Sequence, residues 1–203
     1  MTARVLLATR NRGKLADLQR ILAGTAEVIG LADVPEFPEL PETGATFAEN
    51  ATAKAEQAAA ETGEISLADD SGLAVAALNG MPGVLSARWS GQHGDDTANN
   101  ALLLAQLADV PDERRQAEFV CALALAVPGR PTVVEHGRWP GRIGREAVGD
   151  NGFGYDPLFH PDGGWGTSAE LSPEDKNAQS HRARAFAAIL PALQAALREA
   201  PGR

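Results

Sequence analysis

The sequence predicts an α/β protein with a mixed β-sheet, because it combines strand–helix units with a pair of strands that reads as a hairpin. The apolar run Arg4–Ala8 leads through a polar loop into a helical pattern, which is one strand–helix unit. The runs Gln116–Val127 and Thr132–Trp139, separated by Pro128–Pro131, form the expected hairpin. Strand–helix units build parallel pairs and hairpins build antiparallel pairs, so the class is α/β with a mixed sheet.

The first elements follow from hydrophobic spacing and from proline. After the polar loop Thr9–Lys14, one helical face carries three leucines, Leu15, Leu18 and Leu22. Ala26–Gly30 is expected to form a second strand. The segment Pro35–Gly44 carries three prolines and is expected to be an extended loop.

A second helix and an acidic strand come next. Thr46 and Glu49 have the spacing of a capping box, so a helix is expected to begin there, to run to about Thr62 and to end at Gly63. Ile65–Ala68 reads as a buried strand that leads into Asp69-Asp70-Ser71-Gly72. This order places the acidic pair at a strand edge or a strand end.

The rest of the chain follows similar signals. Asn79–Gly83 has turn chemistry, Thr97–Leu107 is expected to be a helix, and Gly149–Asp156 is rich in glycine. Ser172, followed by a proline and two acids, has the pattern of a helix N-terminus. That helical pattern continues to about Leu197, with an interruption at Pro191.

Length and composition favour one ordinary folded domain spanning 1–203. The chain has 203 residues, of which 44% are hydrophobic and 22% charged. Its longest apolar run, Phe119–Val127, is half the length that a membrane helix needs. No export signal is evident at the start, so a cytoplasmic location is expected. The single cysteine, Cys121, lies within the apolar run and is expected in the core, which excludes a disulfide framework.

The charge balance limits the possible partners. The chain has 18 basic and 27 acidic residues, a net charge of -9. Duplex nucleic acid is therefore an unfavourable partner, because phosphate neutralisation needs a basic face. A small phosphorylated ligand needs only a few local cations, and the acidic excess could hold a divalent cation that carries the ligand's charge.

Several familiar catalytic motifs are absent. Gly13-Lys14 lacks the earlier glycine and the following Ser/Thr of a phosphate loop. Gly164–Ala169 matches a dinucleotide fingerprint by letter, but no clear strand precedes it. The sequence also lacks zinc-ligand histidine pairs, CxxC and GxSxG, so zinc hydrolase and serine hydrolase chemistry lack their parts.

Two polar clusters in the first half are not needed by a packed core. The loop Thr9–Lys14 carries three cations between a strand and a helix, where amides and the helix N-terminus suit phosphate oxygens; a solvated loop is an equally good interpretation. Asp69 and Asp70 are adjacent in a strand, so they point to opposite faces and only one can face a given pocket. One of them could bind a metal or activate water, although a turn alone would also explain Asp-Ser-Gly.

Two further clusters lie near the C-terminus. Gly152–Pro157 holds two aromatic residues between residues of special backbone geometry, which suits base stacking or, alternatively, a tight turn with core aromatics. Lys176, His181 and Arg182 could not converge on one ligand from one continuous helix, because about 100° separates successive residues. We predict a break at Ser180, with Ser180 capping a new helix, against the simpler alternative of a single solvated helix.

Taken together and in order, these clusters resemble the inosine/xanthosine triphosphate pyrophosphatases, which remove deaminated purine nucleotides. The resemblance covers about residues 4 to 190 and rests on seven groups of residues: Leu7–Lys14; Glu42–Gly44 with Phe47–Asn50 and Lys54; Ala68–Leu73; Pro82-Gly83 with Ser86–Arg88; Trp139–Gly141; Phe153–Asp156; and Lys176 with Ser180–Arg182. Arg10 departs from the pattern, because the family often has glycine there.

The resemblance implies a fold, partners and site residues. The implied fold is an elongated mixed sheet flanked by helices, with two lobes around a central cleft, in a homodimer. Asp70 resembles the catalytic carboxylate, and Glu42 with Asp70 resemble the acids that bind Mg²⁺. The implied substrate contacts are Thr9, Arg10, Asn11, Arg12, Gly13, Lys14, Lys54, Ser71, Arg88, Phe153, Gly154, Tyr155, Asp156, Lys176, His181 and Arg182. The implied substrate is a small nucleoside triphosphate, with no nucleic acid or membrane partner.

The implied reaction is hydrolysis of ITP, dITP or XTP to the monophosphate and pyrophosphate. Water attacks the α-phosphorus, and Mg²⁺ with Lys and Arg groups must neutralise the charge that develops on the leaving group. Asp70 would orient or deprotonate that water. Two alternatives stay open: a non-catalytic nucleotide-binding sensor, and a related pyrophosphatase acting on pyrimidine or modified nucleotides.

Overall fold

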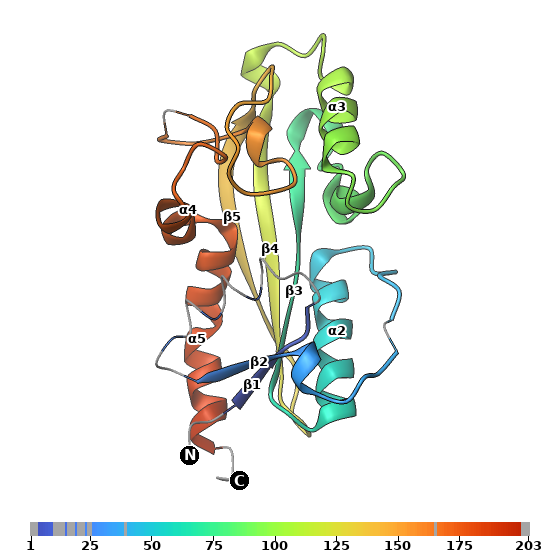
Figure 1. Ribbon diagram of the computed structural model, residues 1–203, viewed down its shortest axis with the longest axis vertical. Coiled ribbons are helices and arrows are strands. Elements are labelled where there is room, and N and C mark those ends of the chain that lie inside the picture. The colour runs from blue at the N-terminus through green and yellow to red at the C-terminus, as the bar shows by residue number, and fades with distance from the viewer. Residues whose placement is uncertain are drawn as a thin grey trace. The chain divides into compact units, whose positions relative to one another are not determined.

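The structure is a computed structural model that describes residues 4–9, 15, 19, 23, 26–38, 40–164 and 166–199 (Figure 1). The loop residues Arg10, Asn11, Arg12, Gly13 and Lys14 lie outside the described residues, as do Leu18 and Leu22 of the first predicted helix. The phosphate contacts predicted at the loop residues, and the leucine face predicted for the first helix, therefore stay predictions.

The sheet has six strands in the order β2-β1-β3-β4-β5-β6. Their bounds are β1 Arg4–Leu7, β2 Glu27–Gly30, β3 Ser66–Val75, β4 Gln116–Ala126, β5 Val133–Ile143 and β6 Phe159–Pro161. β1 pairs in parallel with both β2 and β3, whereas β5 pairs antiparallel with β6. The predicted mixed α/β class is confirmed.

The described helices are α2 Phe47–Thr62, α3 Asp96–Gln106, α4 Pro173–Gln179 and α5 His181–Glu199. The Thr46 hydroxyl accepts from the Glu49 amide at 3.2 Å, and Gly63 ends α2 at φ 69°. The Glu49 carboxylate accepts from the Ala45 amide at 2.6 Å, so it satisfies a donor one residue ahead of the cap. The predicted start and end of this helix are confirmed.

The chain forms two compact units. The first comprises Met1–Asp70, Cys121–Gly137 and Arg182–Arg203, and the second comprises Ser71–Val120 and Arg138–His181. The single domain of the sequence analysis and the cleft between two lobes stay predictions. None of the described helices combines the length and the apolar character needed to cross a membrane.

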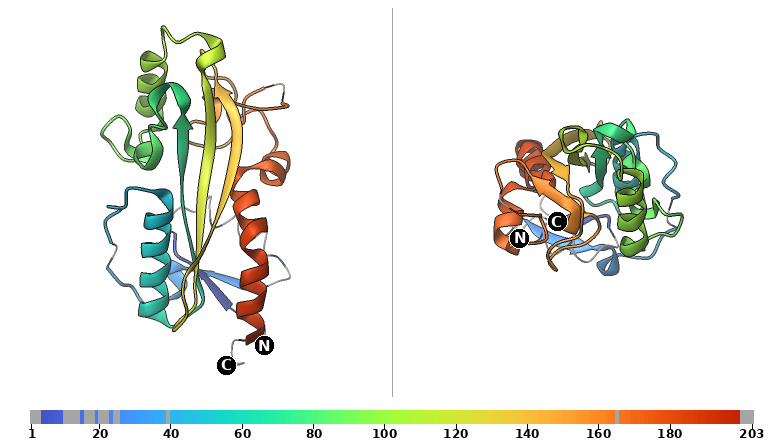
Figure 2. Two further views of the ribbon diagram at one scale, coloured as in Figure 1. Left: turned by 180° about the vertical axis from the view of Figure 1, so that it is seen from behind. Right: turned by 90° about the horizontal axis from the view of Figure 1, so that it is seen from above.

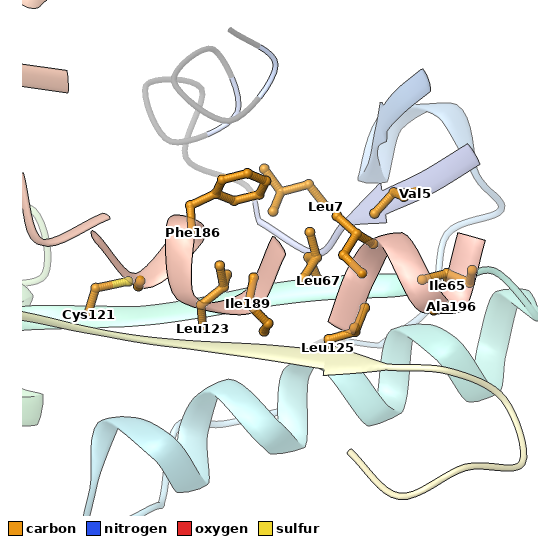
Figure 3. Close-up of a cluster of buried hydrophobic side chains, with 12 residues drawn as sticks. Val5, Leu7, Ile65, Leu67, Cys121, Leu123, Leu125, Phe186, Ile189 and Ala196 are labelled. Carbon is orange, nitrogen blue, oxygen red and sulfur yellow. The ribbon is translucent and has the colours of Figure 1, made fainter. Parts of the chain in front are cut away.

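The core of the first unit has two faces because neighbouring strand residues alternate in direction. On one face, Leu67 of β3 and Leu123 of β4 pack with Phe186 and Ile189 of α5 (Figure 3). On the other face, Ala68 of β3 packs with the alanines of α2. The helices α2 and α5 accordingly lie on opposite sides of these strands (Figure 1, Figure 2). Cys121 is buried at 1% exposure in the α5 cluster, as expected.

The core of the second unit is more aromatic. Phe119 packs against Phe159 with ring centroids 4.6 Å apart, and Trp139 packs against Phe159 at 5.5 Å. Arg115 is only 2% exposed and donates to four backbone carbonyl oxygens, those of Leu107, Val110, Ile143 and Gly144. These bonds satisfy the buried guanidinium and tie the end of α3 to the end of β5.

Two sequence expectations are wrong, and both fail for a tertiary reason. Asp69 and Asp70 lie in the middle of the continuous strand β3, because that strand extends beyond the end of β1 at Leu7. The Asp-Ser-Gly turn is absent for the same reason. Pro191 does not interrupt α5, which runs through it to Glu199. Buried contacts of Ile189 and Leu193 flank the proline and offset its cost of about 3 kcal/mol.

Candidate functional site

The first unit gathers two acids around a lysine. The Lys54 ammonium group, on α2, donates to Glu42 Oε1 at 2.9 Å and to Asp70 Oδ1 at 3.4 Å. Glu42 comes from the extended loop before α2, and Asp70 comes from β3. The structure therefore brings together the two predicted metal-binding acids and one predicted cation, which we call the acid cluster.

The acid cluster includes an asparagine that sequence reasoning did not assign. Asn50 lies one helical turn before Lys54, and its side-chain amide contacts both Asp70 and the backbone of Gly44. Residues four apart on a helix share a face, and this spacing from Lys54 is the signal that could have identified Asn50.

Lys54 carries a positive charge within the acid cluster. Burial lowers the pKa of its ammonium group, but the charge of Asp70 and the hydrogen bond from Lys54 to Glu42 outweigh burial, and the pKa is raised. A lysine whose pKa lies above its ordinary value is fully protonated near neutral pH. Lys54 is therefore available as a cation for an anionic ligand.

Asp69 and Asp70 face opposite sides of β3, as predicted. Asp70 contacts Asn50 and Lys54 on α2, whereas Asp69 Oδ2 lies 3.7 Å from the Arg182 guanidinium on α5. Both carboxylates are buried, at 4% exposure for Asp69 and 7% for Asp70. The same alternation that sorts the core residues thus assigns only Asp70 to the acid cluster.

Thr9 lies at the end of β1, beside a pocket of about 600 Å³. The pocket is lined by Thr9, Leu15 and residues 30–37. β1 and β2 are parallel, so Thr9 and the residues after Gly30 follow the carboxyl ends of neighbouring strands. Ligands of α/β proteins commonly bind at that edge of a sheet.

In the second unit, Asp156 organises the glycine-rich loop. Its Oδ2 accepts from the Phe153 amide at 2.9 Å and from the Lys176 ammonium group, and its Oδ1 accepts from the Ser168 hydroxyl at 2.7 Å. The Lys176 ammonium also lies over the Phe153 ring, 5.3 Å from its centroid. The structure thus joins the predicted Phe153–Asp156 segment to Lys176, in what we call the aromatic loop site.

The two aromatic residues of this loop have different surroundings. Phe153 is 41% exposed, whereas Tyr155 is 4% exposed and packs in the core of the second unit. The Tyr155 hydroxyl donates to the Ser86 carbonyl oxygen at 2.9 Å, and burial followed by the charge of Asp96 raises its pKa. Of the two aromatic residues, Phe153 is therefore the one that reaches the surface.

Two residues of α3 hydrogen-bond to the backbone N–H and C=O groups of Gly154. Asp96 Oδ2 accepts from the Gly154 amide at 2.6 Å, and Asn100 Nδ2 donates to its carbonyl oxygen at 2.9 Å. Gly154 has φ 63°, a conformation that favours glycine. Sequence reasoning did not assign Asp96 and Asn100, although their spacing of four residues on a polar helix start was a usable signal.

The remaining predicted site residues occupy separate places. Ser71 follows Asp70 on β3, and Arg88 ends the short 3₁₀ helix Gly83–Arg88. His181 stacks on Phe119 with ring centroids 5.0 Å apart. The predicted break is confirmed, because Ser180 has non-helical φ -64° and ψ 161° between α4 and α5.

The donor set of the acid cluster suits a hard divalent cation that is shared with a ligand. Across the described part of the chain, no group of three or more His, Cys, Asp or Glu side chains could hold a metal ion. Glu42 and Asp70 nevertheless each place a carboxylate oxygen on the Lys54 ammonium group, so the two acids lie close together around a cation. Mg²⁺ commonly binds proteins through one or two carboxylates and completes its shell with water and substrate phosphates.

The chain is thus an α/β protein with a mixed sheet. Its third strand, β3, carries a buried aspartate that is paired with a lysine. Comparison with known sequences gives the family: residues 5–192 match the Ham1 family, and the chain belongs to it.

Named relatives cover nearly the whole chain. It is 66% identical over 197 residues to the dITP/XTP pyrophosphatase of Nocardia farcinica, covering 95% of this chain and 96% of that one. It is similar to the crystal structure of a nucleoside-triphosphatase / dITP/XTP pyrophosphatase from Mycobacterium abscessus, with 61% identity, a TM-score of 0.79, and coverage of 93% and 99%. A HAM1 protein from Coxiella burnetii matches with 42% identity, a TM-score of 0.84, and coverage of 98% and 100%.

Proposed function

We propose that this protein is a hydrolase that cleaves deaminated purine nucleoside triphosphates, namely ITP, dITP and XTP, to the monophosphate and pyrophosphate. The observation that carries the proposal is the acid cluster: a buried aspartate on the central strand β3, paired with a lysine and a second acid. The names of the relatives at 66% and 61% identity support dITP and XTP among these substrates.

In the acid cluster, Asp70 would orient or deprotonate the attacking water. A positioned general base of this kind contributes about 10² to 10⁴ in rate. Lys54, charged near neutral pH, would contact the phosphates and stabilise the negative charge that grows on the leaving pyrophosphate. Its contacts with Glu42 and Asp70 hold it in place before substrate binds.

Glu42 and Asp70 would hold Mg²⁺ together with the substrate phosphates. When bound, the ion would neutralise charge on the triphosphate during cleavage. Hard carboxylate oxygens are the ligands that this ion prefers, and the small protein donor set leaves positions for phosphate oxygens.

The other predicted contacts divide between phosphate and base. The loop residues Thr9–Lys14 would bind the triphosphate, and the position of Thr9 at the carboxyl end of β1 supports this assignment. Arg88 would add positive charge, and Ser71 would contact the substrate beside Asp70.

In the aromatic loop site, Phe153 would stack on the base. The exposed Phe153 ring and the held backbone of Gly154 support this assignment. Lys176 would lie beside the base, where its contact with Asp156 fixes it, and Tyr155 would support the loop from the core.

Base selection follows from hydrogen-bond chemistry. Hypoxanthine and xanthine present a 6-carbonyl acceptor where adenine presents an amino donor. Arg182 is always a donor and His181 can donate, so both suit the carbonyl and oppose the amino group. An unpaired buried donor costs about 1 to 3 kcal/mol, so ATP should be a much poorer substrate than ITP.

The assembly and the location complete the proposal. We infer a homodimer in the cytoplasm, on the resemblance of the sequence motifs to the family. Sedimentation of the purified chain at several concentrations tests the dimer, because the measured mass is twice that of one chain for a dimer and falls on dilution only as the concentration approaches the dissociation constant.

The experiment that tests the function is a substrate panel of ITP, dITP, XTP, GTP and ATP with separate detection of pyrophosphate and orthophosphate. We expect pyrophosphate from the first three and weak turnover of ATP. Binding without turnover would indicate a sensor instead, and a preference for pyrimidine or other modified nucleotides would indicate the related pyrophosphatase.

A further inference from the structure

The Asn50 side chain is buried, at 3% exposure, and makes two hydrogen bonds, one as donor and one as acceptor. Its Nδ2 donates to Asp70 Oδ2 at 3.0 Å, and its Oδ1 accepts from the Gly44 amide at 2.8 Å. The two partners fix which end of the side-chain amide is which, because a backbone N–H needs an acceptor and a carboxylate needs a donor.

These bonds close a ring of polar contacts within the first unit. Asn50 bonds one oxygen of Asp70, and Lys54, one turn further along α2, bonds the other at 3.4 Å. Lys54 also reaches Glu42, whose loop returns through Gly44 to Asn50. The two Asp70 oxygens therefore have different donors from one helix face, which fixes the rotation of the carboxylate.

The backbone approaches Asn50 closely at Gly44. A Cβ atom built on Gly44 would lie 2.6 Å from Asn50 Oδ1 and 2.8 Å from the Glu49 Cβ. Any side chain there would push the loop away from α2. The absence of a side chain at Gly44 thus allows one asparagine to connect the loop of Glu42 with Asp70.

We propose that Asn50 is a positioning residue of the reaction, which holds the Asp70 carboxylate at a fixed rotation and at a fixed place relative to the Glu42 loop. This inference rests on the proposed function for the identity of the reaction. Asp70 is the group that acts on water, and a displacement of a catalytic group by about 1 Å can cost about 10²-fold in rate.

Replacing Asn50 by aspartate keeps its hydrogen bond with the Gly44 amide and removes its hydrogen bond to Asp70. Asn50→Asp has nearly the same shape and still accepts from the Gly44 amide, but it offers Asp70 a carboxylate instead of a donor. We expect kcat for ITP to fall by about 10²-fold, with KM changed by less than about threefold, because the phosphate contacts stay in place. A purely loop-tethering role predicts near-normal kcat for this variant.

The exchanged pair Asn50→Asp with Asp70→Asn tests the contact without substrate. In the double variant the amide introduced on β3 can donate to the carboxylate introduced on α2, so the bond re-forms with its polarity reversed. We expect Asn50→Asp alone to lower Tm and the double variant to recover at least about half of that loss, while turnover stays lost because the carboxylate is at the wrong residue.

The matched control is Asn99→Asp, which places a carboxylate at a helical asparagine of 2% exposure on α3. It should lower Tm while leaving kcat for ITP within about twofold.

Additive Tm losses in the exchanged pair, or a kcat of Asn50→Asp within twofold of the wild type, would overturn the proposal. A wild-type protein inactive on every triphosphate would instead overturn the proposed function. The two failures are distinguishable, because the Tm comparison tests the Asn50–Asp70 contact without any substrate.

Discussion

Asp70 and Asp156 are both buried aspartates that contact a lysine, and the differences between them separate two kinds of site. Asp156 accepts from a backbone amide, a hydroxyl and Lys176, all from segments that it holds together. Asp70 accepts from two side chains of a single helix, and the distance to Lys54 is 3.4 Å. Asp156 fixes the shape of a loop, whereas Asp70 is held at one rotation beside a cation.

From this difference we infer different roles for the two carboxylates. A carboxylate committed to a loop contributes to binding through the geometry of that loop, because its partners are the groups that give the loop its shape. A carboxylate oriented by side chains and placed beside a second acid suits metal binding and water activation. We therefore expect changes at the acid cluster to affect kcat and changes at the aromatic loop site to affect KM.

The largest expected effect comes from removing the divalent metal. EDTA should abolish pyrophosphate release from ITP, and excess Mg²⁺ should restore it, because Glu42 and Asp70 need a cation to bring a triphosphate beside two carboxylates. The measurement is initial rate against free Mg²⁺ concentration. Full activity in the chelator would remove the metal role of both acids.

Replacing Asp70 by Asn should reduce single-turnover pyrophosphate release by about 10² to 10⁴. The amide is nearly isosteric but accepts a proton poorly and binds a metal weakly, so Tm without ligand should change little. Asp150→Asn, at an exposed carboxylate, is the control and should match the wild type. A near-normal rate for Asp70→Asn would exclude this residue from the chemistry.

Asp156→Asn should have a smaller effect of a different kind. It removes the charge that Lys176 contacts. Its single amide oxygen can accept from the Phe153 amide or from the Ser168 hydroxyl but not from both, because these donors contact different oxygens of Asp156, so the loop loses part of its support. We expect KM for ITP to rise about tenfold with kcat within about threefold. A drop in kcat with unchanged KM would mean that the comparison between the two aspartates is wrong.

The smallest expected effect concerns base selectivity. Arg182→Ala should lower the ITP over ATP ratio of kcat/KM several-fold, by losing ITP activity more than ATP activity. Arg182 also lies 3.7 Å from Asp69, so Asp69→Asn is the control that removes the ion pair and keeps the guanidinium. If both substrates fall by the same factor, Arg182 serves the phosphates or the fold.

Local patterns in the sequence predicted most elements and part of the site. Alternation along a strand predicted that Asp69 and Asp70 face opposite sides, and helical spacing predicted the break at Ser180. These inferences succeeded because they depend on backbone periodicity, which neighbouring residues express. The path of α5 through Pro191 was missed, because packing of its apolar face outweighs a local propensity.

The partners of the supporting residues could not be inferred from local pattern. Asp96 and Asn100 bind Gly154 across more than fifty positions of sequence, and Asn50 binds Asp70 across twenty. Helical spacing could have marked Asn50, Asp96 and Asn100 as candidates, but such pairs arise from tertiary packing, and no periodic signal in a single sequence gives the distant partner. Sequence reasoning therefore identified residues with chemical character more readily than the residues that orient them.

The central claim is that water attacks the α-phosphorus of a deaminated purine triphosphate. Hydrolysis of ITP in water enriched in the heavy oxygen isotope, followed by mass spectrometry of both products, tests it most directly. We predict one heavy oxygen in the inosine monophosphate and none in the pyrophosphate, because the bond that breaks lies between the α-phosphorus and the bridging oxygen. Heavy oxygen in pyrophosphate, or release of orthophosphate with the diphosphate, would contradict the account.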